Sequence, residues 1–156
     1  MKNNGSMMMG STLLAVLLIA LLIRVPAIKV AYNGEAFLLK EKEFEIGWIH
    51  SVEKEPWFEK YKLEKGNLIL TETRFKTFGA GTPSSGQTIP SDDGYVHMQI
   101  NQKMEAVHLT VSKNVRTTLY TNDSTIPLHK LAGDHETIMI DSKKIPVWQM
   151  LRGEWK

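Results

Sequence analysis

The sequence predicts a mainly β protein: an antiparallel β-sandwich or partly open barrel preceded by one N-terminal transmembrane helix. Three observations support this fold class. A long apolar stretch without charges lies near the N-terminus. The rest of the chain shows short runs of β-branched and aromatic residues at a spacing of roughly 8–12 residues, with turn residues between them. Only residues 128–131 look helical. We therefore divide the chain into an N-terminal membrane anchor, residues 1–26, and a β-rich domain, residues 27–156.

The anchor is predicted from residues 7–23, which contain no charged side chain. A helix of that length spans about 26 Å, slightly less than the ~30 Å hydrocarbon core of a bilayer. Arg24 ends the apolar run, and Pro26 cannot continue the hydrogen bonds of a helix. A cleaved signal peptide is the alternative, because residues 25–27 offer small side chains to a signal peptidase. Arg24 beside that site favours a retained anchor. The chain is then a single-pass protein of the cell membrane that contacts the lipid bilayer through residues 7–23.

The orientation of the anchor is not decided by its flanking charges. Lys2 precedes the span, whereas Arg24 and Lys29 follow it, so the positive-inside rule does not choose a side. The short N-terminal tail, the absence of cysteine and a start that resembles a signal peptide favour an extracytoplasmic domain. We therefore expect the β-rich domain outside the cytoplasm.

The first strands of the domain are predicted to form a hairpin. Residues 27–32 and 35–39 flank Asn33-Gly34, a dipeptide that readily adopts the positive φ angles of a tight turn. In residues 44–48, apolar side chains alternate with other residues, as expected of a half-buried strand.

Further strands follow at short intervals. A second hairpin is predicted from residues 57–63 and 68–75, joined through residues 65–67. The remaining runs with strand character are residues 95–100, 104–111, 115–121, 137–140 and 145–150. Residues 76–94 form the one long irregular segment, and a loop of that length in a compact domain is usually functional or disordered.

Composition excludes several classes of function. The chain has no cysteine, which rules out disulfide scaffolds, thiol catalysis and cysteine-bound zinc. Its net charge is +2, and lysines and glutamates are mixed along the sequence. Nucleic-acid binders show clustered basic faces instead, so we expect no nucleic-acid partner.

The motifs that suggest catalysis or cofactor binding have simpler interpretations. His50-Ser51 with nearby glutamates resembles parts of a catalytic triad, but adjacent side chains of a strand point to opposite faces. The run Phe78-Gly-Ala-Gly81 is not followed by the helix that a phosphate loop requires, so it predicts a turn. The histidines lack His-x-His and His-Glu-x-x-His spacings. The sequence therefore predicts no catalytic residue, no metal site and no cofactor.

Two longer motifs carry a family resemblance: His50-Ser-Val-Glu-Lys-Glu-Pro-Trp-Phe-Glu59 and Phe78-Gly-Ala-Gly-Thr-Pro83. Together they resemble the bacterial domain-of-unknown-function 1850 family, over about residues 13–150. The resemblance departs from the pattern at Trp57, where a small aliphatic residue is common, and in the charged tail after residue 151. The motif positions are His50, Ser51, Glu53, Pro56, Glu59, Phe78, Gly79, Gly81 and Pro83.

The resemblance implies a partner. Members of that family are commonly encoded beside the fused membrane subunit and the binding protein of TAXI-type TRAP transporters, which are ion-driven uptake systems for organic acids. It therefore implies a non-enzymatic accessory protein that associates with the TRAP transporter membrane subunit. No activity is established for the family, so no catalytic residue is carried over.

The residues themselves predict that the two motifs meet. Both lie at strand ends, so His50, Glu53 and Glu59 are expected near the backbone N–H groups of residues 79–81. Carboxylates accept hydrogen bonds from such groups well. Such a cluster is either an internal brace or a binding site, and sequence does not separate these. The alternative function is an extracytoplasmic ligand- or metal-binding domain that uses the His50/Glu53/Glu59 cluster.

Overall fold

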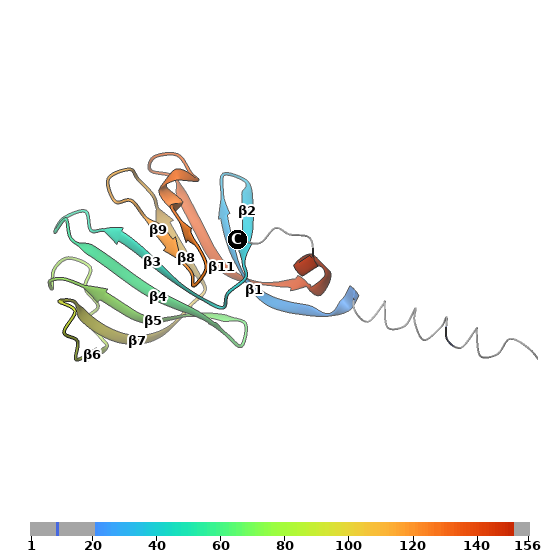
Figure 1. Cartoon of the computed structure of the whole chain (residues 1–156), viewed down its shortest axis with the longest axis horizontal. Coiled ribbons are helices and arrows are strands. Elements are labelled where there is room, and N and C mark those ends of the chain that lie inside the picture. Colours follow the sequence, from blue (N-terminus) through green and yellow to red (C-terminus); the bar gives the residue numbers. More distant parts are fainter. Residues whose placement is uncertain (1–8, 10–20, 152–156) are drawn as a thin grey trace, which may run out of the picture.

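The computed structural model describes residue 9 and residues 21–151, and antiparallel β-strands dominate them (Figure 1). The prediction of a mainly β, antiparallel fold is therefore confirmed. Residues 10–20, which carry most of the predicted anchor, lie outside the described residues, so contact with the bilayer stays a prediction. Within the described part of the chain, no helix has the length and apolar character needed to cross a membrane.

The strands of residues 21–151 form two sheets. The first sheet contains β1 (Arg24–Tyr32), β2 (Glu35–Leu39), β8 (Ala106–Thr110) and β11 (Thr137–Pro146), in the order β2-β1-β11-β8. The second contains β3 (Glu43–Ile49), β4 (Pro56–Glu64), β5 (Asn67–Phe75), β6 (Gln87–Ile89), β7 (Val96–Met104), β9 (Thr118–Tyr120) and β10 (Thr125–Ile126). Its order is β10-β9-β3-β4-β5-β7-β6. Two short 3-10 helices complete this part of the chain, η1 (Leu128–Lys130) and η2 (Val147–Leu151).

Both predicted hairpins are present. In the turn between β1 and β2, Asn33 has φ 46° and Gly34 has φ 79°. The turn between β4 and β5 repeats this geometry, with Lys65 at φ 50° and Gly66 at φ 79°. Two consecutive positive φ angles give a turn whose twist matches that of the flanking strands. Local turn chemistry therefore set these two connections.

Two segments differ from the sequence-based expectation. The stretch predicted to be irregular, residues 76–94, contains β6, in which Thr88 pairs with Met98 of β7. The two strands predicted at residues 137–140 and 145–150 are one strand, β11, followed by η2. The polar residues between them do not interrupt pairing, because Lys143 and Lys144 stay in register with Ala27 and Pro26 of β1. Both side chains are exposed, so the two lysines extend the strand without burying a charge.

One apolar cluster receives side chains from both sheets. Its almost fully buried members include Ile28, Val30, Ile138 and Ile140 from the first sheet and Ile46, Tyr61, Leu68 and Leu119 from the second. Within residues 21–151, each sheet keeps two edge strands, so the two sheets do not close into a barrel.

The register of the second sheet places two loops at one end. Ile49 at the end of β3 pairs with Pro56 at the start of β4, and Trp57 pairs with Phe75 at the end of β5. Residues 50–55 and the segment after Phe75 therefore leave the sheet side by side. Figure 1 shows this end of the molecule far from the start of β1. We call residues 50–55 and 76–83 the loop apex.

Candidate functional site

Glu53 joins the two halves of the loop apex. One of its carboxylate oxygens makes a very short contact with Nδ1 of His50. The other oxygen accepts the backbone N–H of Ala80 at 3.0 Å. The hydrogen bond from Ala80, with a further contribution from His50, holds the pKa of the Glu53 carboxyl below its ordinary value. Of the predicted cluster, Glu53 therefore meets the glycine-containing turn, and His50 is linked to that turn through Glu53.

The proton on the His50 ring is assigned from these contacts. Nδ1 also lies 3.4 Å and 3.5 Å from the backbone N–H groups of Val52 and Glu53, which would require Nδ1 to accept. The Glu53 carboxylate is much closer and can only accept from an Nδ1–H. We therefore place a proton on Nδ1, and the opposite ring nitrogen, Nε2, is left for other contacts.

The two motif glycines are needed for different reasons. A side chain at Gly79 would collide with Glu53, since an added Cβ would lie 2.8 Å from the carboxylate carbon of Glu53. Gly81 has φ 79°, a conformation that L side chains rarely adopt, while the space around it is open. The N–H and the hydroxyl of Thr82 both donate to the Gly79 carbonyl, at 3.3 Å and 2.9 Å. The Phe78–Pro83 motif is thus a tight turn, as predicted.

Glu59 does not join this cluster. Its carboxylate accepts a short hydrogen bond from the Tyr61 hydroxyl, two residues along the same strand. Glu59 lies between Ile46 of β3 and Thr73 of β5, inside the sheet rather than at its end. Burial raises the pKa of the Glu59 carboxyl. Because each residue advances a strand by about 3.3 Å, Glu59 lies too deep in the sheet for the turn to use it.

An aromatic group forms the floor of the loop apex. The His50 ring stacks on Trp57 with ring centroids 5.3 Å apart, and Trp57 packs against Phe75 at 4.8 Å. Phe78 contacts Phe75 edge to face at 5.2 Å. The buried indole N–H of Trp57 donates to the Thr73 hydroxyl at 2.8 Å. Sequence reasoning missed this role of Trp57, because it depends on the pairing of β3 with β4, in which Trp57 lies opposite Trp48.

A second polar link was also missed. The Thr77 hydroxyl donates to the Glu55 carboxylate at 2.7 Å and connects the same two segments as Glu53 does. Within residues 50–55, the N–H of His50 donates to the Glu55 carbonyl at 2.8 Å and that of Lys54 to the His50 carbonyl at 3.0 Å. The loop apex is therefore held by its own backbone and by two carboxylates.

The remaining motif residues have other surroundings. Ser51 is exposed, and in the described part of the chain no hydrogen bond joins its hydroxyl to His50. Pro56 begins β4 and pairs with Ile49, while Pro83 is half-buried after the turn. The described residues contain no group of three or more His, Asp or Glu side chains placed to hold a metal ion.

The outer tips of the loop apex are apolar. Val52 is 67% exposed and Phe78 is 64% exposed, although both belong to the braced segments. The space enclosed between His50, Glu53 and Thr77 is only about 10 Å³, which holds no more than one water molecule. The site therefore offers a surface at its tips rather than a cavity among its charges.

The comparisons with known proteins are consistent with the motif assignment. A family model described as a domain of unknown function, DUF1850, matches residues 44–128, which include both motifs and the loop apex. No curated protein and no solved structure matches the chain significantly. The family match covers more than half of the 156 residues, and the chain therefore belongs to the DUF1850 family.

Proposed function

We propose that the protein is a non-enzymatic, membrane-anchored interaction module whose loop apex contacts the membrane subunit of a TAXI-type TRAP transporter. The observation that carries this proposal is the pair of exposed apolar side chains, Val52 and Phe78, on two braced loops. Apolar patches exposed on a protein surface often mark protein contacts. The transporter as partner follows from the resemblance in the two motifs, and the substrates of such transporters are organic acids.

The bracing of the loops supports a contact role. Two carboxylates tie residues 50–55 to residues 76–83, through Ala80 and through Thr77. Loops that are ordered before binding lose less conformational entropy when a partner docks. Val52 and Phe78 are therefore presented in one arrangement, as the anchor residues of an interface are.

The alternative of a ligand or metal held by His50, Glu53 and Glu59 has less support. Glu59 bonds to Tyr61 and not to the turn, and the enclosed space at the other two side chains is about 10 Å³. A small organic molecule needs a few hundred Å³. The contacts of Glu53 with His50 and Ala80 are better explained as a brace that holds the contact surface in place.

The proposal is tested by co-purification. Full-length tagged chain is co-expressed with the transporter's membrane subunit and recovered from detergent-solubilised membranes. Val52→Ser and Phe78→Ser should each lower the recovery of the subunit, with a loss of affinity of about tenfold, since each removes one buried apolar contact. Ile89→Ser is the matched control, because Ile89 is another exposed apolar residue but lies on β6 outside the loop apex.

Two outcomes would contradict the proposal. The first is unchanged recovery of the subunit with both Val52→Ser and Phe78→Ser. The second is an equal loss with Ile89→Ser, which would show only that surface apolar area matters. Val52 is the sharper position, because Phe78 also packs against Phe75 and its replacement can loosen the loop.

A further inference from the structure

A groove of about 320 Å³ opens beside the loop apex, between the end of β3 and the segment that follows β8. It is separate from the exposed tips, since neither Val52 nor Phe78 lines it. We propose that this groove binds a small organic anion through carboxylate or phosphate oxygens. The proposal does not depend on the transporter contact.

The ionisable side chains that line the groove are all basic. They are His50 and Lys54 from the loop apex and His135 from the opposite wall, and no Asp or Glu of the described residues lines the groove. Two neighbouring carboxylates lie against the lining histidines: Glu53 contacts Nδ1 of His50, and an oxygen of Asp134 lies 3.7 Å from Nε2 of His135. Lys54 has no carboxylate partner among the described residues, and its ammonium group donates to the Ser51 carbonyl. An ammonium group without a carboxylate partner attracts anions, so the proposal rests on the charge of Lys54.

His50 is oriented for this role. Glu53 occupies Nδ1 of its ring, and the ring face rests on Trp57, so Nε2 is the nitrogen left for a ligand. Because the carboxylate holds Nδ1, a ligand can hydrogen-bond to this ring only through Nε2. The Glu53–His50 pair therefore serves both the brace and the groove.

The groove also contains polar side chains without partners. Lys54 donates one of its three ammonium hydrogens to the Ser51 carbonyl, and two remain. The side chains of Thr110 and Asn114 have no hydrogen-bond partner among residues 21–151. Buried Ser112 accepts the N–H of Val115 at 3.3 Å, and its hydroxyl hydrogen is left to donate. Together these groups supply several donors for the oxygens of an anion.

The two walls of the groove are fixed to each other. The N–H of Ile49 at the end of β3 donates to the carbonyl of Val115 at 2.8 Å. On the far wall, the N–H of His135 donates to the Val111 carbonyl at 2.8 Å, and His135 keeps φ 66°. The cleft is therefore largely formed before binding. Its volume lies at the lower end of the range for small-molecule sites, which suits a molecule of a few carbon atoms.

The test is calorimetric titration of the full-length chain in detergent, at constant ionic strength and pH 6.5. The probes are succinate, inorganic phosphate and succinamide, which is the neutral analogue of succinate. We expect saturable binding of succinate or phosphate, with Kd below about 1 mM, and none of succinamide. Lys54→Met should weaken the binding about tenfold, because it removes a charged donor and keeps the length of the side chain.

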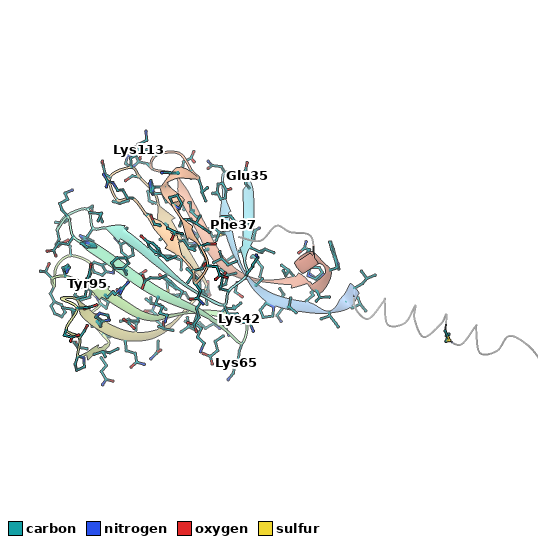
Figure 2. The ribbon with its side chains drawn as sticks, in the orientation of Figure 1. Glu35, Phe37, Lys42, Lys65, Tyr95 and Lys113 are labelled. Carbon is teal, nitrogen blue, oxygen red and sulfur yellow. The ribbon has the colours of Figure 1, made fainter. Side chains whose placement is uncertain are left out.

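Lys113→Met is the matched control. Lys113, labelled in Figure 2, is an exposed lysine on the segment after β8 but does not line the groove. We expect its replacement to leave the affinity unchanged. The inference is overturned if neither anion binds saturably at 10 mM, a concentration about tenfold above the expected Kd. An equal loss in Lys113→Met and Lys54→Met would overturn it too, because it would indicate diffuse attraction to surface charge.

Discussion

At the residue scale, one glutamate determines how the two motifs meet. Glu53 contacts His50 and Ala80 at once, whereas Glu59 bonds to Tyr61. Both glutamates lie in the same motif and have the same side chain. Their roles differ because Glu53 lies in the loop between β3 and β4, whereas Glu59 lies within β4. Gly79 completes the arrangement, since only a residue without a side chain leaves room for the Glu53 carboxylate.

This dependence predicts a coupling between Gly79 and Glu53. Gly79→Ala should lower Tm by about 3–5 °C, because the added methyl group displaces the carboxylate from the Ala80 N–H. In a Glu53→Ala background, the same change should have almost no effect on Tm, because the collision partner is gone. The measurement is a double-mutant cycle by thermal unfolding.

Gly81 supplies the control for that cycle. No atom of the described residues lies within 4 Å of a Cβ added at Gly81, so Gly81→Ala is unfavourable only through its φ of 79°. Its effect on Tm should be the same in the presence and absence of Glu53. Additive effects at Gly79, or coupling at Gly81, would contradict the assigned roles of the two glycines.

At the element scale, the turn before β7 is held to β5 by a histidine between two acids. His97 Nδ1 lies 2.6 Å from Glu72 on β5, and Nε2 lies 3.0 Å from Asp93 in the turn. Burial lowers the pKa of His97, but the hydrogen bonds to Asp93 and Glu72 outweigh that effect and raise the pKa above its ordinary value. A bond from Ser91, with help from Tyr95 and His97, lowers the pKa of Asp93 to about 2.

The direction of the His97 shift predicts a loss of stability with rising pH. A histidine whose pKa is raised on folding contributes fully below its unfolded pKa of about 6.5, and the contribution disappears as the pH passes the folded pKa. The difference in unfolding free energy between wild type and His97→Gln should therefore be largest near pH 5.5 and shrink towards pH 9. Urea denaturation across that range measures it. His108→Gln is the control, since His108 is exposed on β8. If this variant showed the same pH dependence, the effect could not be assigned to the contacts of His97.

At the scale of the whole molecule, the loop apex and the start of β1 lie at opposite ends (Figure 1). If residues 7–23 anchor the chain, the loop apex projects away from the bilayer. The transporter contact that we propose would then involve a part of the membrane subunit outside the hydrocarbon core. This geometry makes the orientation of the domain a critical measurement.

The predicted extracytoplasmic orientation can be measured with a single thiol. The chain has no native cysteine, and Thr125 is exposed on β10, so Thr125→Cys introduces one accessible site. A membrane-impermeant maleimide should label this variant in intact cells. Labelling only after lysis would contradict the orientation. A mature protein that starts at Ile28 would contradict the retained anchor.

The sequence alone was sufficient for features that depend on neighbouring residues. Asn33-Gly34 specified the first hairpin through its own φ preferences, and Gly81 marked the turn of the second motif in the same way. The recurrence of strand-forming runs determined the antiparallel β class. The family membership was likewise readable from two motifs of ten and six residues.

Only the tertiary structure decided which distant residues meet. The pairing of Trp57 with Phe75 determines where the segment after β5 leaves the sheet. As a result, the N–H of Ala80 reaches the Glu53 carboxylate, whereas Glu59 lies inside the sheet. The groove likewise exists because the end of β3 hydrogen-bonds to Val115, far along the chain. Strand periodicity tells which face a side chain occupies, and turn chemistry fixes the register within a hairpin. Neither tells which segments far apart in the chain lie side by side. That arrangement depends on the packing of the whole core, and this is why the site itself could not be read from the sequence.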